Sequence, residues 1–243
     1  LKKIIENFKS KKLDSRNFDY EVQIKKTKRL KTISLTVRDK NVIISCPYWT
    51  TENKIKKLIL AKENWIKKII NIQSERENII NINKNNGNYL FKGKTIKLRL
   101  KKSLNTSLKY IQNCILICTA DFSNENINKL LSQWFRSQAK IYIGERLQFY
   151  SEVMNVRFSD LIIKSYKARW GSCDSRSKIS INWRLIMAPK SVLDYVVIHE
   201  LSHISYPNHS KFFWRHVRKY KPNFESDKRW LKKNGFILNS QII

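Results

Sequence analysis

The sequence predicts an α+β fold, in which a β-hairpin-rich region with one helix precedes a helix–sheet domain. Strictly alternating apolar residues, such as Ile33, Leu35 and Val37 in TISLTVR, indicate paired strands in the first half. Longer stretches with apolar residues at helical spacing indicate amphipathic helices. Only five glycines and four prolines occur in 243 residues, which argues against long linkers. With 42% apolar residues, the chain can bury a sizeable core.

The first predicted region covers residues 1–85. TISLTVR and NVIISC form a hairpin around a turn at 39–41, and an amphipathic helix follows over 51–80, with Trp65 in its core-facing stripe. The asparagine-rich NINKNNGN, residues 81–88, is predicted to be a loop and marks the boundary. The charged start, residues 1–13, indicates a short basic amphipathic helix rather than a signal peptide.

A second region, 86–122, is a β-hairpin segment made of YLFKGKTIKLRL and SLKYIQNCILICT. Cys114 and Cys118 would share one strand face, and we interpret them as small buried side chains. A zinc knuckle would need a second close pair of cysteines, which the sequence lacks.

The third region, 123–243, begins with an amphipathic helix over 125–150. A strand over 160–166, a polar loop over 171–178 and a strand over 179–185 are predicted to follow. Ser191 and Asp194 have capping-box spacing and predict a helix start, and that helix runs to about residue 204, before Pro207-Asn208. No internal repeat is recognised in the sequence.

The charge of the chain is extreme, with 49 Lys and Arg against 19 Asp and Glu and a net charge of +30. Such a field attracts anionic partners, which include nucleic acid, an anionic membrane and acidic substrates, so nucleic acid contact through the basic surface is one expectation. Lys, Ile and Asn also share AT-rich codons, so codon bias would give the same composition without that role. No apolar run reaches the ~18–20 residues of a membrane span, and we expect a cytoplasmic protein without a transmembrane segment. The oligomeric state stays open.

The stretch HELSHISYPNH, residues 199–209, holds three of the four histidines. His199 and His203 are four residues apart on a predicted helix, so both imidazoles can bind one ion. Glu200 is turned roughly 100° from His199 and reaches a water on that ion rather than the ion itself. This is the H-E-x-x-H arrangement of zinc hydrolases, with Glu200 as the base.

His209 follows after a predicted break in the helix. A continuous helix would turn it away from the other two histidines, whereas Pro207 and Asn208 let the chain present it as a third ligand. Three protein ligands and a water form the open site of a catalytic zinc ion, although another divalent metal suits the same donors. The fourth histidine, His216 in FFWRHVRKY, is predicted to be structural.

Residues 169–214, RWGSCDSRSKISINWRLIMAPKSVLDYVVIHELSHISYPNHSKFFW, resemble the YgjP-like metal-dependent hydrolases, which are grouped with zinc metallopeptidases. That family has RWGSC, S-x-N-W-R-L, H-E-L-x-H and N-H-S-x-x-F-W in this order, and all four stand here. KPNFESDKRWLKKNG resembles the family's ending, and the N-terminal hairpins fit it more loosely. Ser202 departs from the family, which often has Ala or Cys at this position.

The resemblance implies a zincin-like helix–sheet metallopeptidase domain over 123–243, kin to SprT- and WLM-type peptidases. It carries the metal ligands onto His199, His203 and His209 and the catalytic acid onto Glu200. One Zn²⁺ and a peptide or protein substrate are then expected. The candidate substrate-binding residues are Arg169, Trp170, Ser172 and Tyr206. Arg169 and Tyr206 are candidates for the oxyanion partner, which the sequence does not identify. The stretch with Trp170, Ser172 and Cys173 forms either the floor or edge of the cleft or a tight turn with a packed Trp.

Two other functions remain open on the sequence alone. A nucleotide phosphohydrolase or pyrophosphatase would use the same activated water, and the basic excess would suit triphosphates, although no glycine-rich phosphate loop is present. A nucleic-acid-binding protein with a structural metal would also be basic. Glu200 argues against it, because a structural site needs no base.

Overall fold

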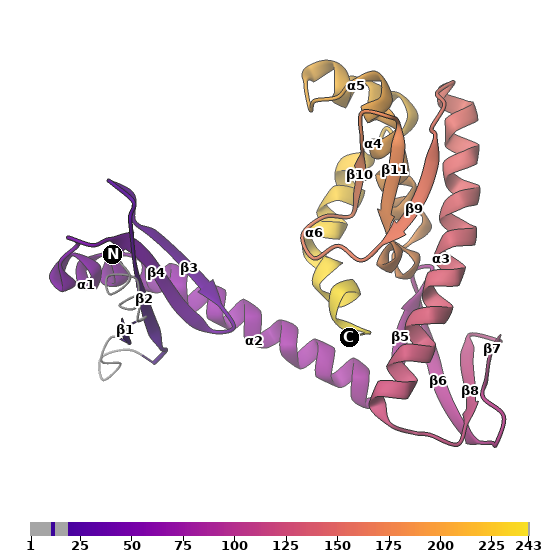
Figure 1. The fold of residues 1–243 in the computed structure, drawn as a ribbon, viewed down its shortest axis with the longest axis horizontal. Helices are drawn as coiled ribbons and strands as arrows, with labels where there is room; N and C mark the ends of the chain where they lie inside the picture. The colour runs from indigo at the N-terminus through magenta and orange to yellow at the C-terminus, as the bar shows by residue number, and fades with distance from the viewer. Residues whose placement is uncertain (1–10, 13–18, 243) are drawn as a thin grey trace, which may run out of the picture. The chain divides into compact units, whose positions relative to one another are not determined.

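The computed structural model describes residues 11–12 and 19–242 and divides the chain into two compact units, Leu1–Ile79 and Ile80–Ile243 (Figure 1). Each unit has its own apolar core, and helices and strands mix in both, which confirms the α+β prediction. The division into 1–85, 86–122 and 123–243 stays a prediction. The basic helix predicted over 1–13 lies outside the described residues, except that Lys11–Lys12 form the short strand β1.

The first unit consists of a four-stranded sheet and helices that pack on one of its faces. β2 (Val22–Thr27), β3 (Ser34–Arg38) and β4 (Asn41–Pro47) join β1 in the order β1-β2-β4-β3, with β2 and β4 parallel. α1 (Glu52–Ala61) and α2 (Glu63–Asn85) follow, and α2 continues past Ile79, where the first unit ends. The fully buried contacts between sheet and helices come from Val42, Ile44, Cys46, Ile55, Ile59 and Ile66.

Three predictions for this region are wrong. The helix expected over 51–80 is two helices, because the chain leaves helical geometry at Lys62, whose N–H caps α1. Residues 81–85 of the expected loop belong to α2, and the turn comes only at Gly87, at a φ of 60°. Asparagine lowers helix propensity too weakly to end a helix by itself. Trp65 is 44% exposed rather than in the core, because Ile66 takes the core-facing position.

The second unit begins with another four-stranded sheet, and this confirms both hairpins predicted there. β5 (Asn88–Phe91), β6 (Lys94–Lys102), β7 (Ser107–Ile111) and β8 (Cys114–Thr119) lie in the order β5-β6-β8-β7. Ile115 and Ile117 of β8 are buried, so Cys114 and Cys118 lie on its other face and are half-buried, not buried as expected. The predicted helix over 125–150 is α3 (Asn124–Met154), which ends at Asn155 in the left-handed region.

The two sheets repeat one arrangement that the sequence analysis did not recognise. Each has a hairpin whose second strand runs parallel to the strand before the hairpin, and each is followed by a helix. Both hairpin turns, at 39–40 and 112–113, hold two residues at positive φ. Thr51 and Ser123 then cap the helices, each accepting from the backbone N–H three residues on. The two segments share the order and burial of their elements but not their residue identities, so the sequence does not reveal the repeat.

The remaining elements of the second unit lie along α3 (Figure 1). β9 (Asp160–Lys164), β10 (Gly171–Cys173) and β11 (Lys178–Asn182) form a sheet in the order β10-β11-β9. The 3-10 helix η3 (Trp183–Met187) leads into α4 (Lys190–Ser205), and α5 (Lys211–Tyr220) and α6 (Phe224–Ser240) complete the chain. None of the helices traced in the described residues is long and apolar enough to cross a membrane.

Local predictions around α4 need three corrections. Part of the polar loop expected over 171–178 is strand β10, paired with β11. The strand expected over 179–185 ends at Asn182, whose side chain caps η3 by accepting from the N–H of Arg184. The N-cap of α4 is Pro189 without a side-chain bond, and not Ser191. Asp194 therefore takes no part in a capping box, and its side chain instead hydrogen-bonds to a residue of α3.

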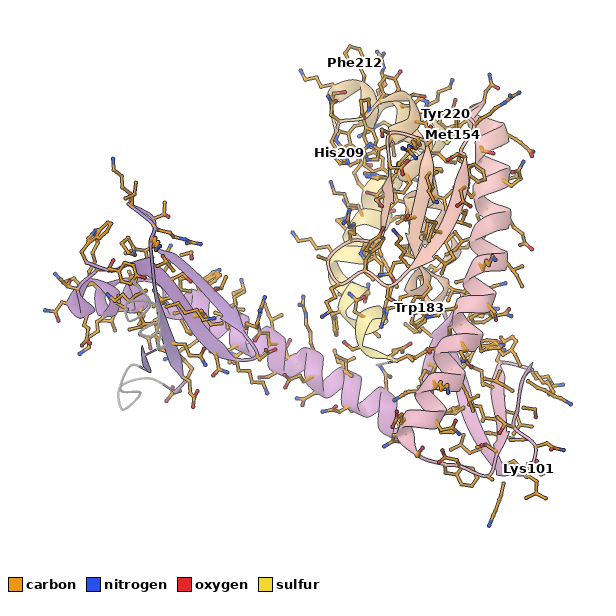
Figure 2. All side chains as sticks on the ribbon, viewed as in Figure 1. Lys101, Met154, Trp183, His209, Phe212 and Tyr220 are labelled. Carbon is orange, nitrogen blue, oxygen red and sulfur yellow. The ribbon has the colours of Figure 1, made fainter. Side chains whose placement is uncertain are left out.

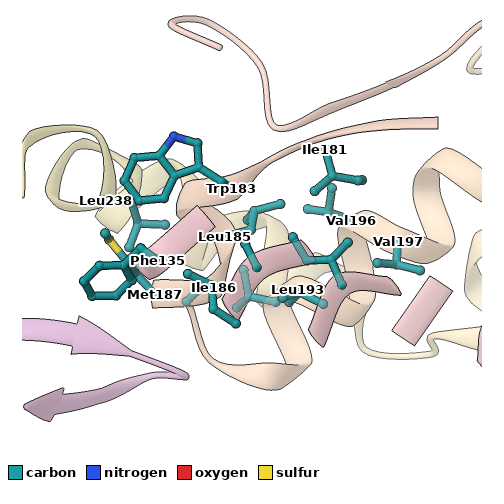
Figure 3. Packing of buried hydrophobic residues seen from close by; sticks show 14 of the residues in the cluster. Phe135, Ile181, Trp183, Leu185, Ile186, Met187, Leu193, Val196, Val197 and Leu238 are labelled. Carbon is teal, nitrogen blue, oxygen red and sulfur yellow. The ribbon is translucent and has the colours of Figure 1, made fainter. Parts of the chain in front are cut away.

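Most residues of α4 are buried in the core of the second unit, part of which is drawn in Figure 3. Leu193, Val196 and Val197 of α4 are almost fully buried and belong to the same cluster as Leu185 and Ile186 of η3 (Figure 3). Apolar side chains from α3, α5, α6 and β11 join the same cluster. A helix covered on nearly all sides is held rigidly, so it can present polar side chains at fixed positions.

A buried ion pair joins α3 to α4. Arg146 donates to both carboxylate oxygens of Asp194 at 2.7 and 3.1 Å, and the side chains are 16% and 7% exposed. Asp194→Ala should lower the free energy of unfolding by about 3 kcal/mol, because it leaves a largely buried guanidinium unpaired. Urea denaturation checks this. Asp160→Ala removes the exposed pair with Lys178 and should change stability by less than about 1 kcal/mol; equal effects would contradict the prediction.

Candidate metal centre

Three histidines converge where α4 ends. His199 and His203 lie one turn apart on α4, with ring centroids 5.0 Å apart. α4 stops at Ser205, and the chain turns back through residues 206–210. The ring centroid of His209 therefore lies 4.9 Å from that of His199 and 4.8 Å from that of His203. One ligand atom from each ring lies within 4.8 Å of the others. The break in the helix thus brings together the three residues predicted as ligands.

Aromatic side chains of α5 hold this cluster in place. Phe213 is fully buried, and its ring centroid lies 4.6 to 4.9 Å from those of all three histidines. Trp214 stacks on His209 at 5.6 Å. His209 itself lies at the α5 end of the second unit, away from Lys101 on β6 (Figure 2). This Phe-Trp pair belongs to the N-H-S-x-x-F-W motif, but the sequence alone does not indicate its role.

The imidazoles have the chemistry of metal ligands. Burial, with smaller contributions from His203, His209 and Lys228, lowers the pKa of His199 to about 3, so its ring stays neutral at physiological pH. The Nδ1 atom of His203 donates to the carbonyl of Tyr206 at 3.2 Å, which leaves Nε2 as its lone-pair donor. His209 Nε2 and His199 Nε2 lie 3.0 Å apart. Three imidazole nitrogen donors fit a zinc ion, whose bonds to histidine are about 2.0–2.1 Å.

Glu200 lies beside the histidines and is only 5% exposed. Burial raises the pKa of its carboxyl to about 8, and the positive charge of Arg169 opposes this rise. A Cβ atom on Gly171 of β10 would lie 2.5 Å from Oε1 of Glu200 and 2.7 Å from its Cγ. The carboxylate therefore packs directly against the backbone of β10, and only glycine leaves room for it.

A cleft of about 350 Å³ opens beside His199 and Glu200. Two of the predicted substrate residues, Arg169 and Trp170, line it. Tyr195 on α4 and two lysines on α6, Lys228 and Lys232, also line the cleft and were not predicted from the sequence. Nothing in a single sequence distinguishes these lysines from the many others, since only the fold brings α6 next to α4.

The other predicted substrate residues point elsewhere. The Ser172 hydroxyl bonds to that of Tyr166 at 3.0 Å, and the ring of Tyr206 packs on His216, 5.1 Å between centroids. Neither residue lines the cleft. Cys173 is half-buried, and burial together with the charge of Glu200 raises the pKa of its thiol to about 11. His216 Nδ1 lies 3.2 Å from the hydroxyl of Ser202, apart from the three-histidine cluster, which agrees with the structural role predicted for it.

Comparison with known proteins decides the family. Residues 31–234 match the model of the YgjP-like metallopeptidase domain. The chain belongs to the YgjP-like metallopeptidase family. This confirms the resemblance, and the family match extends over most of the N-terminal unit, where the sequence patterns fit more loosely. Membership in the YgjP-like family supports a metal-dependent peptidase.

Two solved structures are similar to part of this YgjP-like chain. The metallopeptidase zymogen of Pyrococcus abyssi abylysin is 20% identical, with a TM-score of 0.35, and the match covers 37% of this chain and 93% of that one. The metallopeptidase zymogen of Methanocaldococcus jannaschii jannalysin is 24% identical, with a TM-score of 0.33, and the match covers 37% of this chain and 91% of that one. No curated protein matches the YgjP-like chain.

Proposed function

We propose that this protein is a metal-dependent peptidase whose single ion, zinc by donor chemistry, is held by His199, His203 and His209. When bound, a divalent ion polarises the scissile carbonyl and lowers the pKa of the attacking water. Glu200 takes a proton from that water as its oxygen bonds to the carbonyl carbon. The same carboxyl then gives the proton to the amine as the C–N bond breaks.

The open edge of β10 is the observation that supports a peptide as the substrate. Asn182 N–H donates to Trp170 C=O at 2.8 Å, and Asp174 N–H donates to Lys178 C=O at 3.1 Å. In an antiparallel pair the bonded residues alternate, so Gly171 and Cys173 direct their N–H and C=O groups away from β11. No other strand in the described part of the chain pairs with β10. An extended peptide could add there as a strand, directly beside Glu200.

The test is cleavage of a peptide library by the zinc-loaded protein, followed by mass spectrometry and run beside nucleoside triphosphates. We expect new peptide termini that disappear when a chelator removes the metal. Hydrolysis of triphosphates with every peptide left intact would refute the peptidase and favour the phosphohydrolase. A zinc-loaded protein that binds nucleic acid with a steep salt dependence but hydrolyses nothing would favour the structural-metal alternative.

Gly171→Ala should lower peptide hydrolysis by about 100-fold, because the new methyl group displaces the Glu200 carboxylate and small misplacements of a catalytic group have such effects. The histidines are untouched, so metal content should stay unchanged. Gly144→Ala on α3 is the control, since its Cβ would meet only Leu161 at an ordinary 3.9 Å. Steady-state kinetics and metal analysis of both variants check this. Full activity of Gly171→Ala would show that the Glu200 position does not matter.

A further inference from the structure

Positive charge gathers at the cleft beside Glu200. Arg169, Lys228 and Lys232 line it, and Glu200 is the single acidic residue among the lining side chains. All three basic residues are exposed. Among the described residues, no carboxylate lies within ion-pair distance of any of them. The cleft therefore offers a ligand three cations that have no carboxylate partner in the described part of the chain.

The positions of these side chains follow from the elements that carry them. Lys228 and Lys232 stand four residues apart on α6, so they share one face of that helix. The Nζ atom of Lys228 lies 4.6 Å from the ring centroid of Trp214, which also stacks on His209. Arg169 precedes β10 by two residues, and its charge acts on Glu200. The three cations therefore come from two segments, α6 and the residues before β10, that line the same cleft.

Acidic residues close to the cleft do not neutralise it. Glu225 of α6 is bonded to Arg218, and Asp227 forms an ion pair with Lys221 at 3.3 Å. Since both carboxylates already have partners, they do not balance the positive charge of the three cations that line the cleft. A peptide with an acidic side chain near its scissile bond would supply the missing counter-charge.

We propose that this cleft selects peptides carrying Asp or Glu next to the scissile bond, through Lys228 and Lys232 of α6 and Arg169 before β10. The proposal rests on the peptidase function proposed above. A peptide is favoured over other anions because the same cleft borders the open edge of β10. The positive field both attracts an acidic substrate and holds its side chain beside the scissile bond.

The experiment compares two quenched fluorescent peptide pools that differ only in carrying Asp and Glu, or Asn and Gln, at their randomised positions. We expect the zinc-loaded protein to cleave the acidic pool about 10-fold faster at limiting substrate, and this preference should shrink as salt rises. Lys228→Gln with Lys232→Gln should remove most of the preference. Lys228→Glu with Lys232→Glu should reverse it, while metal content stays the same.

The matched control is Arg229→Glu with Lys233→Glu, which makes the same change of net charge on α6. These two exposed residues are also four apart, but each is one position further along the helix. They are therefore turned by about 100° and do not line the cleft. They should leave the preference for the acidic pool nearly intact. An equal loss in both double variants would overturn the proposal and assign the effect to overall charge.

The outcomes separate this proposal from the peptidase function. Cleavage of both pools at equal rates would overturn acidic selection and leave the peptidase standing. If neither pool is cleaved while nucleoside triphosphates are hydrolysed, and Lys228→Glu with Lys232→Glu stops that hydrolysis, both proposals fall and the cations bind phosphate. Faster cleavage of the acidic pool that is lost only in the cleft variants supports both.

Discussion

Glu200→Gln is expected to lower kcat for peptide hydrolysis by about 10²- to 10⁴-fold, the usual contribution of a general acid–base group. Glutamine keeps the size of the side chain and fills the same place against Gly171, but it cannot accept the proton of the attacking water. Since Glu200 is no ligand in the proposed site, zinc content and the melting temperature should stay close to those of the native protein. Steady-state kinetics on cleaved library peptides, with metal analysis of the same samples, measures both.

The control for this variant is Glu145→Gln, an exposed glutamate on α3. It makes the same chemical change outside the cleft and should leave kcat unchanged. A Glu200→Gln protein that retains zinc and hydrolyses peptides at the native rate would exclude Glu200 as the base. Loss of zinc in that variant would instead place Glu200 among the ligands and contradict the three-histidine assignment.

His203→Ala should remove the metal. It takes away one of three nitrogen donors, and its effect on zinc affinity should exceed the roughly 10- to 100-fold loss that follows removal of an outer hydrogen-bond partner. We expect little zinc after dialysis, and a melting temperature that zinc no longer raises, since a ligand stabilises only the state that binds it. Elemental analysis and thermal unfolding with and without zinc measure these two effects.

His216→Ala is the matched control, because His216 is the fourth histidine of the chain and lies outside the cluster. It should lose the contact to Ser202 and some stability while it keeps its zinc. Stoichiometric zinc in His203→Ala would contradict the ligand assignment. Loss of zinc from both variants to the same degree would point to a general disturbance of α4 and α5.

The sequence predicted most strands and helices because their apolar residues follow regular periods. The predictions failed where neighbouring helical turns or a distant partner outweighed the local pattern. Residues 81–85 look like a loop but continue α2, since helix propensities are small and neighbouring turns outweigh them. Asp194 has the spacing of a capping box, yet its carboxylate bonds to Arg146, a partner 48 residues away. A local pattern cannot reveal a distant partner of this kind.

What the sequence determined by itself is the set of candidate reactive groups. The spacing of His199 and His203, the position of Glu200 between them and the break before His209 are local features, and helix geometry turns them into a metal-site hypothesis. These residues lie within one short stretch of chain, so no knowledge of distant contacts was needed. The family motif around them pointed in the same direction.

What only the tertiary structure decided is the surroundings of those groups. Gly171 comes against Glu200 because β10 packs beside α4, and Lys228 enters the cleft because α6 packs against the same helix. Phe213 packs against all three imidazoles because the chain reverses direction between α4 and α5. Each contact joins residues from different elements, and packing of the whole core sets which of them meet. The burial that shifts the pKa of Glu200 arises in the same way, since it depends on neighbours that lie far away in the sequence.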